Sequence, residues 1–205
     1  PVLLAILAGC TFVVGCNSFD DPDIVVDLRP LAMTADPPEQ LVMLDPTNPP
    51  APAELLMQLG PTRVCALVVD PAFDRRVTYE LRMCTDGGGD RCGHIQVLLA
   101  TGVVDDPDTT TPAPQMCATI DPDGNLLGIL VEILEHDAFG GLGGIDYNVQ
   151  LRFGGEGADP ALDQYASKHV RVAPRIPVAR RPNQNPALRR LEATVDDSPS
   201  SMAIS

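Results

Sequence analysis

The 205-residue sequence contains no tryptophan, and aromatic residues make up only 4% of it. The chain therefore lacks the tryptophan that packs against the disulfide of antibody domains. Serine is also scarce: Ser167 is the only serine between Ser18 and the C-terminal tail, and no Gly-x-Ser-x-Gly pattern occurs. These absences argue against a serine hydrolase, which needs an activated hydroxyl beside a base.

Basic residues are few, 14 against 28 acidic residues, which gives a net charge of −14. This balance disfavours nucleic acid as a partner, because contacts to phosphate supply most of that affinity. The last part of the chain differs, since basic residues dominate residues 164–191. A solvated linker, or contact with anionic lipid headgroups or nucleic acid, would explain this local excess, and the linker is the simpler explanation.

One calcium-loop pattern is partly met. Asp121, Asp123, Asn125 and Glu132 stand at positions 1, 3, 5 and 12 of such a loop. Position 6 is Leu126, where the sharp turn of the loop requires glycine. We therefore predict a hairpin turn here, with a calcium site at these four residues as the alternative, and we expect no cofactor.

The N-terminus carries the most informative pattern. An apolar run, Val2–Val14, is shorter than the roughly 20 residues of a membrane span but has the length of a signal-peptide core. Gly15-Cys16 and a polar segment follow. A cysteine after a small residue resembles the lipobox of bacterial lipoproteins, which implies cleavage before Cys16 and its acylation. Leu7-Ala8-Gly9-Cys10 fits the same pattern and remains the alternative.

Cleavage at Cys16 places every residue of the apolar run in the discarded peptide, whereas cleavage at Cys10 leaves four apolar or weakly polar residues exposed. We therefore expect residues 1–16 to be a signal peptide and residues 17–23 a polar tether. The chain begins at Pro1 without a methionine or a basic segment. For this reason we expect that further residues precede it in the complete protein.

Short runs rich in β-branched residues alternate with turn signals, among them seven Asp-Pro dipeptides. The one helical segment that we predict is Ala53–Leu59. The predicted strands are Ile24–Thr34, Arg63–Val69, Val77–Cys84, His94–Ala100, Gln115–Ile120, Leu126–Glu135, Ile145–Phe153 and Tyr165–Val172. Seven or eight such strands predict an all-β domain over residues 24–173, a two-sheet antiparallel Ig-like sandwich.

Four cysteines remain after the leader and the lipidation site, and they allow three pairings. Alternation along Val77–Cys84 places Cys84 on the polar face at the end of a strand, next to a glycine-rich loop that leads to Cys92. We predict a Cys84–Cys92 disulfide rather than a zinc site with His94, because the Cys-x₂-Cys spacing is missing. Cys65 and Cys117 form either a second disulfide or two free thiols.

Residues 174–205 differ in composition from the rest, with several prolines, arginines and asparagines. We expect an extended linker and tail. Leu191, Ala193 and Val195 alternate as at the start of a strand, so a second domain that begins here is an alternative to a frayed terminus.

Several short motifs carry a wider resemblance. They are Asp27–Pro38 behind the lipobox, Tyr79–Cys84 with Cys92, Phe139–Gly141, Tyr165–Lys168 and Pro182–Pro186. In this order they resemble a group of uncharacterised bacterial envelope lipoproteins with an Ig-like domain. The resemblance implies location in the cell envelope, periplasmic or surface-facing, and the sandwich architecture, but no activity.

Taken together, these patterns favour a lipid-anchored protein whose sandwich binds or supports other envelope components without catalysis. We expect the membrane as one partner, through the lipid, and an envelope protein or a glycan as the other. Candidate contact loops are Thr85–Arg91, Val104–Pro114 and Asp137–Gly144. The alternatives are a glycan-active or calcium-dependent enzyme, or the membrane-proximal spacer of a longer adhesin. Glu132 and Glu135 count against a glycan-active enzyme, because on a strand they would face opposite sides.

Overall fold

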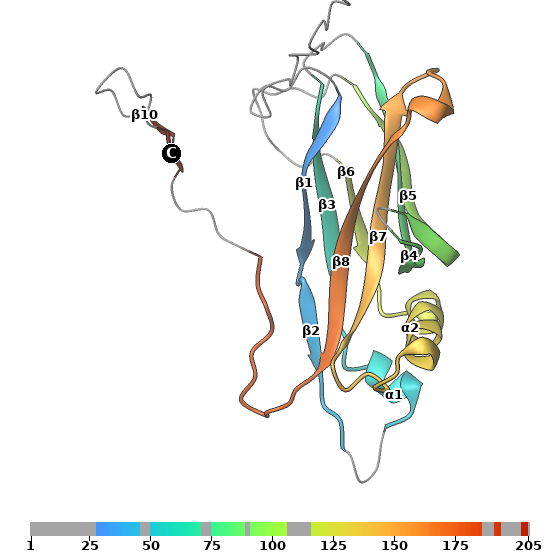
Figure 1. Ribbon diagram of the computed structural model, residues 1–205, viewed down its shortest axis with the longest axis vertical. Helices are drawn as coiled ribbons and strands as arrows, with labels where there is room; N and C mark the ends of the chain where they lie inside the picture. Colours follow the sequence, from blue (N-terminus) through green and yellow to red (C-terminus); the bar gives the residue numbers. More distant parts are fainter. Residues whose placement is uncertain are drawn as a thin grey trace, which may run out of the picture.

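Two β-sheets packed against each other form the body of the protein in the computed structural model (Figure 1). The structure describes residues 28–45, 50–70, 75–88, 91–105 and 116–185, together with the backbone of residues 191–193 and 202–204. Cys10, Cys16, the tether and most of the tail therefore lie outside the described residues. None of the described helices is long and apolar enough to cross a membrane.

The first sheet has three strands in the order β1-β3-β6, and the second has five in the order β2-β8-β7-β4-β5. The strands are β1 (Arg29–Asp36), β2 (Glu39–Val42), β3 (Thr62–Val69), β4 (Val77–Asp86), β5 (Cys92–Val104), β6 (Met116–Ile120), β7 (Ile145–Gly155) and β8 (Gln164–Pro174). The predicted two-sheet sandwich is thus confirmed. Neighbours are antiparallel except for β2 and β8, which are parallel. A separate short pair joins β9 (Leu191–Ala193) to β10 (Met202–Ile204).

Alternation along the strands builds the core between the sheets. On β7, Tyr147, Val149, Leu151 and Phe153 are all at most 1% exposed, and they occupy the face that alternation predicts. Burial raises the pKa of Tyr147 to about 12, while a hydrogen bond with Thr62 on β3 counters this rise. The hydroxyl of Tyr147 therefore connects the two sheets through a polar contact inside an otherwise apolar core.

One predicted strand is wrong. Residues Leu126–Glu135 belong to the helix α2 (Gly124–His136), which follows β6. Its apolar residues recur at the spacing of one helix face, and Leu126, Ile129 and Leu130 are buried. The run is rich in leucine and isoleucine, which fit a strand as well as a helix, and the three- and four-residue spacing decides in favour of the helix.

The predicted hairpin turn at Asp121–Asn125 is also wrong, because this segment leads into α2 and does not connect two strands. Asp123 is the N-cap of α2, and its Oδ1 accepts hydrogen bonds from the backbone N–H groups of Asn125 and Leu126, at 2.9 and 3.1 Å. Two N–H groups of the first turn, which have no partner within the helix, are satisfied in this way. The Asp-Pro-Asp-Gly-Asn sequence therefore begins a helix.

Smaller differences concern the N-terminal part. The first strand begins at Arg29, and residues 24–27 of the predicted strand lie outside the described residues. Only α1 (Pro52–Leu56) represents the predicted helical segment Ala53–Leu59. The strand β2 was not predicted, because it has four residues and follows two prolines.

The sandwich has two distinct ends, and β8 runs between them. At the first, the side-chain amide of Gln164 donates a hydrogen bond to the carbonyl of Leu28, where the described chain begins; we call this the tether end. At the second, the backbone N–H of Arg175 donates to the carbonyl of Val42 at 2.9 Å, close to α1 and α2; we call this the helix end. Ten residue steps along β8 separate the ends by about 33 Å. Figure 1 shows β1 starting at the top and both helices at the bottom.

Candidate functional site

The four cysteines of the domain form two disulfides. Cys65 on β3 and Cys117 on β6 are register partners, with Cα atoms 4.1 Å apart. Cys84 at the end of β4 and Cys92 at the start of β5 close the tip of the β4–β5 hairpin. The prediction of Cys84–Cys92 is confirmed, and of the two possibilities for Cys65 and Cys117 the structure contains the disulfide.

The side chain of Arg91, which precedes β5, reaches across the outer face of the five-stranded sheet. The guanidinium of Arg91 lies 3.3 Å from the centre of the Tyr165 ring on β8, a cation–π contact. Since β7 lies between β4 and β8, the side chain of Arg91 crosses β7 to make it. Among the described residues, the Asn148 amide on this face of β7 and the Thr85 hydroxyl are buried without a hydrogen-bond partner. Each buried polar group without a partner costs free energy, about 1–3 kcal/mol.

A pocket of about 280 Å³ opens on the same outer face, close to the tether end. Arg152 of β7, Glu80 of β4 and Thr101 of β5 are register partners, so they form one row across its floor. The connection from β7 to β8, which contains the short helix η1 (Pro160–Leu162), lines one side of the pocket and contributes Asp163. The pocket is therefore lined mainly by groups that donate and accept hydrogen bonds.

Each charge in this pocket has an opposite charge beside it. Both Nε and Nη2 of Arg152 lie 2.7 Å from Oδ2 of Asp163. Arg82 Nε donates to Glu80 Oε1 at 2.5 Å, and this hydrogen bond lowers the pKa of Glu80 below its ordinary value. In the same way, the hydrogen bond that Arg152 donates to Asp163 favours the charged guanidinium and raises the pKa of Arg152. Glu80, Arg82 and Arg152 are thus ionised at neutral pH.

Gly154 makes the geometry of Arg152 and Asp163 possible. A Cβ atom at this position would collide with the carboxylate of Asp163. A side chain at this position would therefore displace the Asp163 carboxylate from its ion pair with Arg152.

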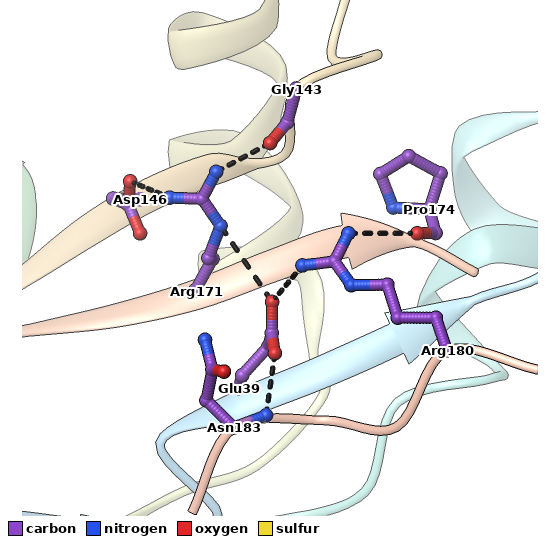
Figure 2. A network of polar contacts seen from close by, with 7 residues as sticks. All are labelled: Glu39, Gly143, Asp146, Arg171, Pro174, Arg180 and Asn183. Atoms are coloured by element: carbon purple, nitrogen blue, oxygen red, sulfur yellow. Dashed lines mark hydrogen bonds and ion pairs between the residues drawn. The ribbon is translucent and has the colours of Figure 1, made fainter. Parts of the chain in front are cut away.

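A second polar cluster surrounds Glu39 on β2, whose side chain is 1% exposed (Figure 2). Its carboxylate contacts Arg180 Nη2 at 2.5 Å, the backbone N–H of Asn183 at 2.6 Å and Arg171 Nε at 3.7 Å. Arg171 also forms an ion pair with Asp146 at 2.8 Å. The buried carboxylate is therefore both paired and hydrogen-bonded, as a charge removed from water must be.

This cluster attaches residues 175–185 to the sandwich. Arg180 Nη1 donates to the carbonyl of Pro174 at 3.2 Å, and the side-chain amide of Asn185 donates to the carbonyl of Ala35 on β1. We call residues 175–185 the strap. Its composition predicts an extended segment, but sequence reasoning missed its contacts, because Glu39 lies 141 residues from Arg180 and 144 from Asn183.

Six large exposed apolar side chains lie on segments at the helix end. Backbone and side-chain hydrogen bonds join the segments that carry them: Met43 pairs with Gln58, and the carbonyl of Gly143 accepts from Arg171. We call these six side chains, which are 50% to 78% exposed, the apolar end cluster: Met43, Met57, Phe139, Leu142, Ile176 and Val178. Two of the six side chains, Phe139 and Leu142, lie in Asp137–Gly144, one of the three loops that we predicted as contact sites.

The calcium candidate is not assembled. Asp123 caps α2, and Glu132 lies nine residues further along the helix, about 13 Å away along its axis. Within the described part of the chain, no group of three or more His, Cys, Asp or Glu residues is arranged to hold a metal ion.

Glu132 instead lies between two histidines. Its Oε1 is 3.3 Å from Nε2 of His94 and 3.5 Å from Nδ1 of His136, and the carbonyl of Glu132 lies 2.9 Å from that same Nδ1. These contacts raise the pKa of His136. The argument that placed Glu132 and Glu135 on opposite sides of a strand is wrong, because both lie in α2, where residues three apart are neighbours.

Other predicted positions are only partly described. Lipidation at Cys16 or Cys10 concerns residues outside the described part, as does most of the loop Val104–Pro114 and part of Thr85–Arg91. Ser167 and His169 both lie on β8 at positions of the same parity, so they share a face of the sheet.

No protein-family model, curated protein or solved structure matches this chain.

Proposed function

We propose that this chain is a lipid-anchored protein of the bacterial cell envelope, periplasmic or surface-facing, whose β-sandwich is a non-catalytic binding module. Cys16 carries the lipid in this proposal, with Cys10 as the alternative. The lipid holds the tether end near the membrane, and the helix end receives an envelope protein.

The apolar end cluster is the observation that carries the binding role. Large apolar side chains scattered singly on a surface need no explanation, but a group of them on neighbouring segments is typical of a site of protein contact. The cluster lies about 33 Å along β8 from the end where the chain enters the domain. An anchored domain would thus offer this end to partners away from its attachment point.

The two disulfides support export. Disulfides persist in oxidising compartments such as the bacterial periplasm and the cell surface, and they are rare in the cytosol. Together with the lipobox-like sequence at residues 13–16, they favour an envelope location.

Anchoring is tested by labelling cells with a radioactive fatty acid and measuring the mass of the mature N-terminal peptide. We expect Cys16→Ser to abolish the label and release the protein from the membrane fraction, whereas Cys10→Ser keeps both. The reverse result moves the lipid to Cys10. An uncleaved, unlabelled product would refute the proposal.

Partner binding is tested by pull-down from solubilised envelopes. We expect the double variant Phe139→Asp with Leu142→Asp to lose its partner, because two charges would enter an apolar contact. Leu162→Asp is the matched control, since Leu162 is 74% exposed, like Phe139, but lies near the tether end. Equal recovery of the partner by all variants would contradict a contact at the helix end.

A further inference from the structure

We propose that the pocket on the outer face of β4, β5 and β7 binds a neutral carbohydrate through hydrogen bonds. This proposal names a ligand class for a second site of the binding module, and it rests on the proposed function only in placing the ligand in the envelope. The residues that would contact the sugar are Thr78, Glu80, Thr101, Arg152 and Asp163.

Charge pairing determines that the ligand is neutral. Arg152 is bound to Asp163 and Glu80 to Arg82, at distances of 2.7 and 2.5 Å. Each charged group of the pocket is already paired with a group of opposite charge. A charged ligand would therefore gain little Coulomb energy in the pocket, while it would lose its hydration. A neutral ligand keeps the pairs intact.

The arrangement of polar groups determines that the ligand carries several hydroxyls. Arg152, Glu80 and Thr101 stand side by side on adjacent strands, which are about 4.8 Å apart. The row therefore presents a donor, an acceptor and a group that is both. A hydroxyl can donate to a carboxylate and accept from a guanidinium at the same time, and neighbouring hydroxyls on a sugar repeat this ability at short spacing.

The boundaries of the pocket limit its size and mode of binding. Its volume of about 280 Å³ lies just below the range for small-molecule sites, about 300–1,000 Å³. The row ends at Tyr165, which is the register partner of Arg152 on β8. The guanidinium of Arg91 already occupies the face of the Tyr165 ring. Recognition by hydrogen bonds rather than by stacking on an aromatic ring fits a chain with so few aromatic residues.

The test is an NMR titration of the full chain, labelled with nitrogen-15, with chitotriose, cellotriose and maltotriose. These three neutral oligosaccharides differ in linkage and substituents. We expect at least one of them, at millimolar concentration, to shift the amide signals of Glu80, Thr101 and Arg152. Glutamate and inorganic phosphate serve as charged comparison ligands and should leave these signals unchanged.

Two variants connect the shifts to the pocket. Arg152→Lys keeps the charge but loses the planar fork, and we expect it to weaken binding about tenfold. Thr101→Val replaces an exposed hydroxyl by a methyl group of similar size and should weaken binding about three- to tenfold. Arg63→Lys, on an exposed position of the other sheet, is the matched control. The wild-type titration does not depend on how any variant folds.

The proposal is overturned if none of the oligosaccharides shifts the pocket signals, if phosphate or glutamate shifts them instead, or if Thr101→Val binds as tightly as the wild type. Failure of the fatty-acid label would refute the envelope anchor without affecting these signals. Absence of sugar binding would leave the anchor and the helix-end contact standing.

Discussion

Cys65–Cys117 joins β3 to β6 in the three-stranded sheet across a sequence separation of 52, whereas Cys84–Cys92 closes a hairpin in the five-stranded sheet across a separation of 8. The chain between Cys65 and Cys117 includes all of β4 and β5. If each disulfide acts by restricting the unfolded chain, the stabilisations are about 4 and about 2.5 kcal/mol.

The two disulfides therefore have different roles in this fold: one joins distant parts of the chain, and the other fixes a local surface element. One disulfide joins strands that are adjacent in space but distant in sequence. The other places a surface element, because the tip that it closes carries Arg91 across β7 to Tyr165. A third connection, the ion pair of Glu39 with Arg180, attaches the strap without a covalent bond.

Removal of the long-range disulfide should have the largest effect. We expect the double variant Cys65→Ala with Cys117→Ala to lose about 4 kcal/mol of stability, since its unfolded chain regains the entropy of a long loop. The melting temperature, measured by calorimetry, should fall by about 8–16 °C. A smaller fall than that of the short-range double variant would refute the difference between the two disulfides.

Removal of the short-range disulfide should have a smaller global but a clear local effect. We expect Cys84→Ala with Cys92→Ala to lose about 2.5 kcal/mol at most. Hydrogen exchange should accelerate at the ends of β4 and β5 and remain unchanged at β3 and β6. Arg91→Ala, which retains the disulfide, separates the contribution of the contact with Tyr165. Uniform acceleration over both sheets would contradict a local role.

The sequence predicts the features formed within one short segment, but not those formed by segments that are far apart in the chain. Alternation within one run located β3, β4, β6, β7 and β8, and the parity of Cys84 with its glycine-rich loop located the short disulfide. The same signal failed for α2, because a run of leucine and isoleucine fits both periods when its three- and four-residue spacing is not weighed.

Features formed by distant segments gave no local signal. The row of Arg152, Glu80 and Thr101 comes from three strands, and its members become neighbours only through the register of the sheet. Glu39 stands in a short strand, and nothing around it indicates that a buried arginine contact from the strap will satisfy it. Both features need the topology, which alternation alone does not supply.

Replacement of Arg180 tests whether the ion pair with Glu39 stabilises the fold about as much as the short-range disulfide does. Removing one partner of a buried pair is strongly destabilising, but Arg171 and the Asn183 N–H still contact Glu39, so we expect Arg180→Ala to cost about 2 kcal/mol. Limited proteolysis should cut the strap faster. Arg181→Ala, the exposed neighbour outside the cluster of Figure 2, should leave both measurements unchanged. Slow cleavage in Arg180→Ala would show that other contacts suffice.

Removal of the helix cap is expected to cost less. Asp123→Ala should lose about 1 kcal/mol, because two N–H groups of the first turn of α2 lose their acceptor. The melting temperature should fall by about 2–4 °C. Asp121→Ala, which changes the neighbouring carboxylate and not the cap, is the control. If Asp121→Ala is equally destabilising, or if added calcium raises the melting temperature of the wild type, the carboxylates have a role beyond capping.

The smallest expected effect is the pH dependence carried by His136. Its pKa is raised, first by a hydrogen bond with the carbonyl of Glu132 and then by the carboxylate of that residue, while Glu135 adds to the rise. The folded state therefore favours the protonated imidazole. Its contribution to stability is fully present below the unfolded pKa of about 6.5 and disappears as the pH rises through the higher folded pKa.

We expect His136→Gln to be slightly less stable than the wild type at pH about 5.5, and equal to it at pH about 8.5, in urea denaturation. His94 faces the same carboxylate, so His94→Gln should leave the sign of the His136 effect intact while changing its size. His169→Gln, on the exposed side of β8, is the control. A difference that grows toward high pH would mean that Glu132 favours the neutral ring, which is opposite to what its carbonyl and carboxylate should do.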